Sequence, residues 1–276
     1  MALGMGQLTI GEFERKVVVN MNRQIIEEVR RNQPLIHHLT NQVVMNFTAN
    51  GLLAFGGSPI MAKAEEEAPS MSTIANGVLI NIGTLQANEL HAMIAAGKAA
   101  NQKGIPVVLD PVGVAATSFR SNAVSQLLTE VQPTVMKGNA GELAHLVNIP
   151  WQSKGVDSFG DGNVEEIAEK VAKEYKTTAV LTGKRDVIST PDMTRINETG
   201  HPILTKVTGA GCLLGSIIAA CLTTSDTPIQ QAHTAVAFYG LAAEYAAAQD
   251  HVNGPGTFIP SFIDALSMDV TQLERI

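Results

Sequence analysis

Aromatic side chains, cysteine and positive charge are all scarce in this chain of 276 residues. Phe, Trp and Tyr make up 4% of the sequence, and only two cysteines are present. Lysine and arginine together number 19 against 26 aspartates and glutamates, which gives a formal net charge of −7. Proteins that wrap nucleic acid usually present a basic face, so this balance argues against a nucleic-acid partner. An anionic ligand would have to be held by local backbone dipoles and a few lysines.

The placement of the two cysteines and of the apolar segments excludes further classes of protein. Cys212 and Cys221 are nine positions apart in one expected helix, which puts them on opposite faces at about 100° per residue. We therefore expect neither a disulfide nor a shared metal site, and no Cys, His or carboxylate spacing matches a zinc pattern. There is no signal-peptide pattern, and no uninterrupted apolar run reaches membrane-spanning length. A cytoplasmic protein without a membrane partner is expected.

Hydrophobic residues make up 45% of the chain, and they recur in short blocks that alternate between strand-like and helix-like patterns. The expected strands are 77–83, 105–111, 133–139 and 177–183, and the expected helices are 88–102, 121–131, 140–147, 163–175, 209–223 and 228–250. Such alternation predicts an α/β fold with a mainly parallel central sheet flanked by helices. Three shorter pieces, 186–190, 193–197 and 203–207, are expected to form an antiparallel edge.

The chain divides into a short extension and one large domain. Residues 1–20 show no pattern that the rest of the core needs, so we expect an N-terminal extension that is dispensable. A helix is expected at the start of the remaining chain, with Ile25, Ile26 and Val29 on one side. No linker divides 21–276, and this length suffices for a single domain with a sizeable core.

Polar residues stand where several of the expected strands end. Asp110 precedes Pro111, Lys137 and Asn139 close the next strand, and Thr182 closes the one after it. Ligands of open parallel sheets bind beyond the carboxyl ends of the strands, so these side chains are expected to converge there. Asp110 and Lys137 also have a purely structural interpretation. Asp-Pro is a common turn starter, and a lysine at a strand end can simply be solvated.

The stretch VTGAGCLLGS places two glycines at the expected start of a helix. Gly209 and Gly211 allow backbone conformations that side chains forbid and expose amides at a helix N-terminus, which suits a phosphate or a developing negative charge. The alternative is a tight turn into a packed helix. The spacing does not fit a dinucleotide-binding fingerprint, and no Walker loop is present.

Two further segments combine polar side chains in a way that has both a structural and a functional interpretation. In KGNAGEL, Asn139 and Glu142 are three residues apart at a strand-to-helix junction, where they can form a helix cap or hold Mg²⁺ near nucleotide phosphates. Residues 37–62 mix His, Thr and Asn with apolar residues, including Met61. They are expected to form either a hydrogen-bonded capping network or one wall of a site for a small heterocyclic ring.

Six stretches, taken in order, resemble hydroxyethylthiazole kinases, the thiamine-salvage enzymes of the ribokinase-like superfamily. They are PLIHHLTNQVVMNFTANGLLAFGGSPIMA, LINIGTL, VVLDPVGVAATSFR, KGNAGELAHL, AVLTGKRDVI and HPILTKVTGAGCLLGS. The resemblance covers about residues 21–270, and six ordered matches are far more specific than one pair of glycines. It implies a ribokinase-like kinase domain that uses ATP to phosphorylate the hydroxyethyl group of 4-methyl-5-(2-hydroxyethyl)thiazole, with Mg²⁺ as cofactor and a homotrimer with substrate pockets at subunit contacts.

The resemblance also implies which residues contact the thiazole and its hydroxyl. Met61 in SPIMA, Asn41 in LTNQ and Gly209 match substrate-contacting positions. Most ribokinase-like enzymes carry Asp after G-A-G as the base for the substrate hydroxyl, whereas the thiazole kinases resemble this sequence in carrying Cys. Cys212 therefore stands in the base position, as a weak base or as a group that positions the alcohol. The amides of Gly209 and Gly211 are expected to carry more of the electrostatic stabilisation.

ATP and Mg²⁺ positions follow from the same resemblance. Lys137 falls where the family often has Arg, at an ATP-contacting position, so the charge is kept but the bidentate geometry is not. Thr182 matches a second ATP contact. Asp110 and Glu142 match the carboxylates near Mg²⁺.

Three other functions fit parts of the same pattern. One is another small-alcohol kinase of this fold, acting on a hydroxymethylpyrimidine or a pyridoxal-like ring. Another is a nucleotide-dependent NAD(P)H-hydrate dehydratase. The last is a nucleotide-binding sensor without turnover, which the cysteine at position 212 suggests and the retained Asp110, Asn139, Glu142 and Thr182 oppose. The N-terminal polar segment and Met61 favour the thiazole alcohol over the other rings.

Overall fold

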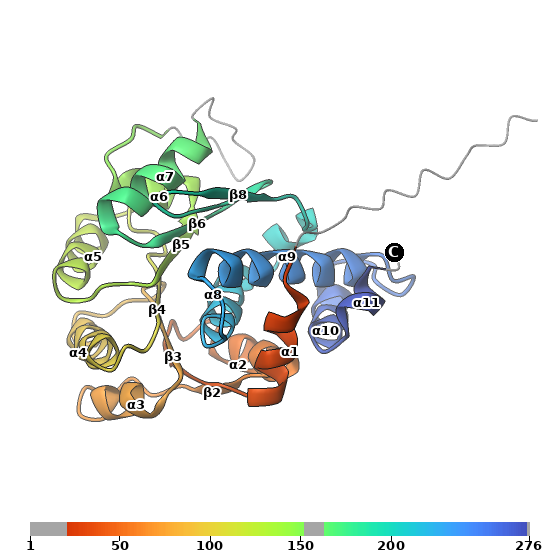
Figure 1. Ribbon diagram of the computed structural model, residues 1–276, viewed down its shortest axis with the longest axis horizontal. Helices are drawn as coiled ribbons and strands as arrows, with labels where there is room; N and C mark the ends of the chain where they lie inside the picture. Colours follow the sequence, from red (N-terminus) through yellow and green to blue (C-terminus); the bar gives the residue numbers. More distant parts are fainter. Residues whose placement is uncertain (1–20, 152–162, 275–276) are drawn as a thin grey trace, which may run out of the picture.

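A single eight-stranded sheet organises the chain in the computed structural model, which describes residues 21–151 and 163–274 (Figure 1). The strand order is β2-β1-β3-β4-β5-β6-β7-β8. The strands are β1 Leu35–Leu39, β2 Ser58–Ile60, β3 Gly77–Asn81, β4 Val107–Asp110, β5 Val135–Asn139, β6 Thr178–Thr182, β7 Asp186–Ser189 and β8 Thr194–Asn197. The first six are parallel to one another, and β7 and β8 are antiparallel to their neighbours. The expected α/β fold and its antiparallel edge are confirmed.

Both faces of the sheet are covered by helices (Figure 1). On one face lie α3 Ala68–Ile74, α4 Glu89–Gln102, α5 Ser118–Glu130, α6 Ala140–Leu146 and α7 Val164–Tyr175. On the other face lie α1 Arg23–Asn32, α2 Met45–Phe55, α8 Ala210–Cys221, α9 Pro228–Ala247, α10 Pro255–Leu266 and α11 Val270–Leu273. A parallel sheet needs this cover because its strands are connected by crossovers that return over its faces.

Alternation along the strands divides the interior into two hydrophobic cores. In β3, Leu79 packs into the core beneath α8 and α9, while Val78 and Ile80 pack into the core beneath α4 and α5. Neighbouring β4 repeats the pattern, with Val108 on the first side and Leu109 on the second. Because both faces are buried, the strands read as continuous apolar runs in the sequence rather than as alternating polar and apolar residues.

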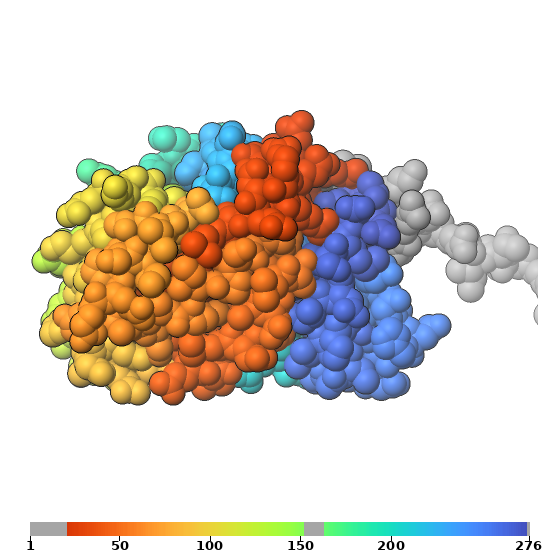
Figure 2. Space-filling model, turned by 90° about the horizontal axis from the view of Figure 1, so that it is seen from below, coloured from red at the N-terminus to blue at the C-terminus, as the bar shows by residue number. Residues whose placement is uncertain are grey.

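The two ends of the described chain pack against each other. Figure 2 shows α1, in red, beside the blue C-terminal helices. Arg30 of α1 makes the link, since its guanidinium donates to the carbonyl oxygens of Leu266 at 3.1 Å and Met268 at 2.7 Å. The expected apolar side of α1 is buried, with Ile25, Ile26 and Val29 each no more than 2% exposed. The expected helix at the start of the domain is confirmed, while residues 1–20 lie outside the described residues.

The structure corrects one expected element and adds others. Residues 203–207 were expected to be a strand, but Pro202–Lys206 form a 3-10 helix that leads to α8. Pro202 sits in the first turn, where its fixed φ suits a helical start, and His201 caps the turn by accepting from the amide of Ile203 at 3.2 Å. The strands β1 and β2 were not predicted, because β1 carries two buried histidines, His37 and His38, that interrupt its apolar pattern.

Candidate active site

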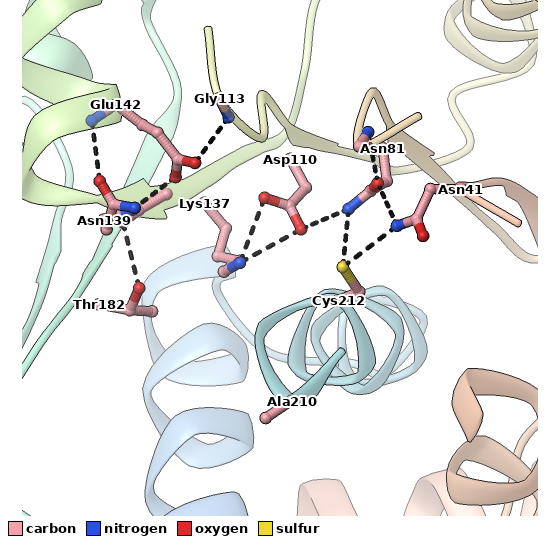
Figure 3. A network of polar contacts seen from close by, with 12 residues as sticks. Asn41, Asn81, Asp110, Gly113, Lys137, Asn139, Glu142, Thr182, Ala210 and Cys212 are labelled. Carbon is pink, nitrogen blue, oxygen red and sulfur yellow. Dashed lines mark hydrogen bonds and ion pairs between the residues drawn. The ribbon is translucent and has the colours of Figure 1, made fainter. Parts of the chain in front are cut away.

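The polar strand ends do converge, at the carboxyl edge of the sheet (Figure 3). The register places Asn81 of β3 beside Asp110 of β4, and Asn139 of β5 beside Thr182 of β6. Lys137, two residues before Asn139, points the same way along β5 and reaches across to β4. The N-terminus of α8 approaches this edge, so the residues that the sequence singled out separately form one cluster.

A buried ion pair lies at the centre of the cluster. The Nζ of Lys137 is 3.2 Å from both carboxylate oxygens of Asp110, and the two residues are 5% and 0% exposed. Burial is the largest single influence and lowers the pKa of Lys137, but Asp110, Glu142 and Cys212 together outweigh it and hold the lysine pKa above its usual value. The lysine therefore stays charged at neutral pH. Removing either partner would leave an uncompensated buried charge, which costs about 3–5 kcal/mol.

Two asparagine amides connect this ion pair to the cysteine. Asn81 Nδ2 donates to Asp110 Oδ2 at 2.7 Å and to Cys212 Sγ at 3.3 Å. Asn41, from the loop after β1, donates through Nδ2 to Asn81 Oδ1 at 3.0 Å and to the same Sγ at 3.4 Å. Burial, with a smaller contribution from Asp110, raises the pKa of the Cys212 thiol above its ordinary value. The thiol is therefore protonated at neutral pH, which weakens the base interpretation and favours the positioning one.

The start of α8 has the geometry that an anion site needs. Gly209 precedes the helix with φ +90°, and a Cβ there would lie 2.6 Å from Val44 Cγ1, so both the conformation and the space require glycine. A Cβ on Gly211 would lie 3.2 Å from Lys137 Nζ. The amide of Ala210 donates to Val207 and that of Leu213 to Gly209, which leaves the first-turn amides of Gly211 and Cys212 without an acceptor among residues 21–151 and 163–274.

Asn139 and Glu142 form a capping box at the start of α6. Asn139 Oδ1 accepts from the amide of Glu142 at 2.9 Å, and Glu142 Oε2 accepts from the amide of Asn139 at 2.9 Å. The other carboxylate oxygen of Glu142 accepts from the amide of Gly113 at 2.8 Å. The structural interpretation of KGNAGEL is thus confirmed, and it fixes the carboxylate at the same sheet edge. Thr182 is held nearby, donating to the carbonyl of Gly138 at 3.3 Å.

The carboxylates of this edge suit a hydrated divalent cation. No group of three or more His, Cys, Asp and Glu side chains among residues 21–151 and 163–274 forms a ligand cage for a metal ion. The charges of Asp110 and Glu142 both raise the pKa of Lys137, so both carboxylates lie near this lysine. Asp110 Oδ1 and both carboxylate oxygens of Glu142 have one protein partner each and keep a second lone pair, whereas Asp110 Oδ2 accepts from both Lys137 and Asn81. Mg²⁺ commonly keeps its waters and is bound through few carboxylates. These two residues therefore fit an ion held through water.

The N-terminal polar segment is held by hydrogen bonds within the protein. His37 Nε2 lies 2.7 Å from the carbonyl oxygen of Ala62, and His38 Nε2 lies 2.7 Å from Ser216 Oγ on α8. The capping-network interpretation of this segment is in this respect correct. Met61 directly follows β2, the edge strand, and is half-buried. It lies at the rim of the sheet, two strands away from Asn81, whereas Asn41 is inside the cluster.

Asn81 is the site residue that the sequence analysis missed. It ends the strand that was expected at 77–83, so the rule that selected Asp110, Lys137 and Thr182 would have selected it as well. The apolar residues of GVLINIG predict a strand, and Asn81, its one polar residue, was not considered separately. Its position opposite Asp110 in the sheet is what brings it into the cluster.

Comparison with known proteins identifies the family of this chain. The hydroxyethylthiazole kinase family matches residues 26–272. Hydroxyethylthiazole kinase 1 of Oceanobacillus iheyensis is 63% identical over 247 residues, which cover 90% of this chain and 96% of the relative. The structure of a hydroxyethylthiazole kinase protein from Pyrococcus horikoshii has a TM-score of 0.83 at 35% identity and covers 92% of this chain and 95% of its own.

A more distant likeness concerns the fold alone. A ribokinase-like superfamily protein from Enterococcus faecalis has a TM-score of 0.63 at 17% identity, covering 89% of this chain and 94% of its own. Within the described part of the chain, no helix has the length and apolar character needed to cross a membrane. The family match and the 63% identity together favour the thiazole kinase over the other alcohol kinases and the dehydratase. The chain, with its sheet-edge cluster facing the first turn of α8, belongs to the hydroxyethylthiazole kinase family.

Proposed function

We propose that this protein transfers the γ-phosphoryl group of ATP to the hydroxyl of 4-methyl-5-(2-hydroxyethyl)thiazole. The observation that carries the proposal is the free amide pair of Gly211 and Cys212 at the start of α8, facing Lys137 and the Cys212 thiol, in a chain of this family. In the reaction the hydroxyl oxygen forms the new bond to the γ-phosphorus, and the bond from that phosphorus to the ADP oxygen breaks with its electron pair. Such transfer passes through a loose transition state with negative charge on the phosphoryl oxygens.

The amides and the lysine are placed to stabilise that charge. First-turn amides point along the helix axis toward the sheet edge, and they cost no reorganisation when charge develops. Lys137 adds a full positive charge within the same space, since a Cβ on Gly211 would already touch its Nζ. The ion pair with Asp110 fixes the lysine in place. Cys212, protonated at neutral pH, serves to orient the alcohol.

ATP is expected to lie along the β5–β6 side of the sheet edge. Lys137 and Thr182 are the proposed contacts, the first through its charge and the second through its hydroxyl. The adjoining turn after β6 is fixed by Asp186, whose Oδ1 accepts from the amide of Gly183 at 3.0 Å. Asp110 and Glu142 would hold Mg²⁺ through its bound waters, and the ion would neutralise charge on the transferred phosphoryl group when it is bound.

The thiazole is expected to lie on the opposite side of Cys212, with Asn41, Gly209 and Met61 as contacts. Met61 is at the edge of the sheet, so a pocket that includes it is completed by a neighbouring subunit in the homotrimer that we propose. Exposed apolar side chains in the segment between β1 and β2 support an interface, since Val43 is 68% exposed and Leu53 of α2 is 56% exposed.

An assay of ADP release tests the proposed function. Release should depend on both the thiazole alcohol and Mg²⁺, and the phosphorylated thiazole should appear in equal amount. Hydroxymethylpyrimidine and pyridoxal serve as matched alcohols, and hydrated NADH with ATP tests for dehydratase turnover. Nucleotide binding without product from any of these substrates would indicate a sensor. Light scattering coupled to gel filtration measures the subunit number, and a monomeric mass would contradict the trimer.

A further inference from the structure

Asn81 forms four hydrogen bonds that use its amide completely. Its Oδ1 accepts from the amide of Gly83 at 2.9 Å and from Asn41 Nδ2 at 3.0 Å. Its Nδ2 donates to Asp110 at 2.7 Å and to Cys212 Sγ at 3.3 Å. An asparagine side chain offers two donors and two acceptor lone pairs, so no further bond is available. At 1% exposure the side chain is also shut off from solvent.

The side-chain amides of Asn81 and Asn41 have a fixed orientation, because neighbouring groups can act only as a donor or only as an acceptor. The backbone N–H of Gly83 can only donate, so it must face the oxygen of Asn81. The Asp110 carboxylate is paired with Lys137 and can only accept, so it must face the nitrogen of Asn81. Asn41 then has to turn its own nitrogen toward the oxygen of Asn81. A flip of either amide would place two donors or two acceptors against each other.

The fixed orientation of these two amides determines the hydrogen bonds of the Cys212 sulfur. Sγ accepts one N–H from Asn81 and one from Asn41, which occupies the two lone pairs of a thiol. Its S–H bond therefore points away from both amides, to the side that is open at the start of α8, where Cys212 remains partly exposed. A sulfur saturated in this way has no lone pair free to take a proton from an alcohol, but it can donate its own hydrogen to the alcohol oxygen.

We propose that Asn81 is a positioning residue that, together with Asn41, fixes Cys212 as a hydrogen-bond donor to the oxygen of the substrate alcohol. The proposal rests on the proposed kinase function and deepens it. The attacking oxygen keeps one lone pair for the γ-phosphorus and accepts the S–H with the other. Its own proton is then free to pass to a phosphoryl oxygen as the new P–O bond forms, and the thiol is unchanged at the end of the reaction.

A double-mutant cycle measures whether Asn81 acts through the sulfur. Asn81→Ala should lower kcat roughly tenfold in the wild-type background, as expected for losing one effective hydrogen bond. In a Cys212→Ala background, the fold-loss of kcat caused by Asn81→Ala should be at least threefold smaller, because the sulfur that Asn81 contacts is absent. The loss that remains there reports the bond of Asn81 to Asp110. An equal fold-loss in the two backgrounds would overturn the proposal.

The control is Asn101→Ala, at the opposite end of the sheet. Asn101 also uses both amide atoms, donating to the carbonyl of Gln132 at 2.9 Å and accepting from its amide at 2.7 Å. Its loss should leave kcat and the coupling with Cys212→Ala unchanged. Asn81→Ser, which leaves a smaller cavity and keeps a short donor, is measured in parallel and should show the same sign of coupling if Asn81→Ala does not fold.

A measurement without substrate separates this proposal from the proposed function. The S–H stretching band in the infrared reports the hydrogen bonds of each thiol. Cys212→Ala identifies the Cys212 band, and the fully buried Cys221 provides an internal reference. Asn81→Ala or Asn81→Ser should shift the Cys212 band and leave the Cys221 band in place. An unshifted Cys212 band in a folded variant refutes the contact, whether or not the protein phosphorylates the thiazole.

Discussion

Replacing Cys212 by alanine, serine and aspartate distinguishes a donor at this position from a base. The sulfur accepts two amide hydrogens at 3.3 and 3.4 Å, and burial raises the pKa of its thiol. The wild-type enzyme should therefore use the protonated thiol, and kcat should not follow thiolate formation between pH 6 and 8. If a thiolate were the base, kcat would rise about tenfold with each pH unit below the thiol pKa.

The structure also sets the size of each effect. Alanine loses one hydrogen bond to the alcohol, worth about 0.5–1.5 kcal/mol, so kcat should fall roughly threefold to tenfold with little change in KM. Serine keeps a donor and should stay within about threefold of the wild type. Aspartate meets two N–H donors already in place, which suits a carboxylate, and it adds a base that is ionised at neutral pH. Its kcat should equal or exceed that of the wild type.

The assay is kcat from ADP release for all four forms between pH 6 and 9, with circular dichroism to verify folding. The wild type should keep its kcat toward pH 6, because its thiol is already protonated at neutral pH. Two results would refute the reasoning. One is a wild-type kcat that climbs with pH across the whole range. The other is an alanine form equal to the wild type at every pH while the aspartate form is inactive, which would leave Cys212 without a chemical role.

Three further predictions concern other parts of the chain. Glu142→Gln should raise the Mg²⁺ concentration that gives half-maximal activity. It should also lower the free energy of unfolding by about 1–3 kcal/mol, because the new NH₂ group would face a backbone N–H donor. Unchanged Mg²⁺ titration and denaturation curves would remove Glu142 from the metal site. Burial raises the pKa of Asp186 to about 6, so the folded state binds the proton more tightly than the unfolded chain. The stability that the folded state gains from this tighter proton binding is full at low pH and is lost as pH rises through about 6. In urea unfolding, the free energy of unfolding of the wild type minus that of Asp186→Asn should therefore be about 1 kcal/mol larger at pH 5 than at pH 7. An equal difference at the two pH values would contradict this prediction. A chain that starts at Met21 should keep the activity and subunit number of the full chain, and losing either would show that residues 1–20 contribute to the assembly.

The parallel core of the fold could be predicted because its signals are local. Strands such as 107–110 are short runs of branched apolar residues bounded by Pro and Gly, and the helices between them carry their own periodicity. The segment 202–206 could not be predicted in this way. Its apolar and β-branched residues favour a strand, but it has no partner strand and instead turns the chain into α8, so its conformation is decided by tertiary context.

Several residues of the cluster could be predicted one at a time, but Asn81 and the hydrogen-bond network could not. The strand-end rule found Asp110 and Lys137, yet only the sheet register reveals that they pair with each other and with Asn81. Whether a thiol at a helix start has a raised or a lowered pKa is also beyond the sequence. The helix N-terminus favours the thiolate, but burial and a nearby carboxylate oppose it, and the balance depends on how deeply Cys212 is packed.

The protonated state of Cys212 has a consequence for the durability of the enzyme. Peroxides and alkylating electrophiles react with thiolates and scarcely with thiols, so the raised pKa slows both kinds of attack at neutral pH. Many enzymes with a cysteine facing their substrate are inactivated by oxidants because that cysteine must be an anion to work. A cysteine that contributes only a hydrogen bond escapes this conflict. Burial and the nearby Asp110 keep the sulfur protonated although the two amides that orient it favour the thiolate, and the site can hold a sulfur atom that oxidants attack slowly.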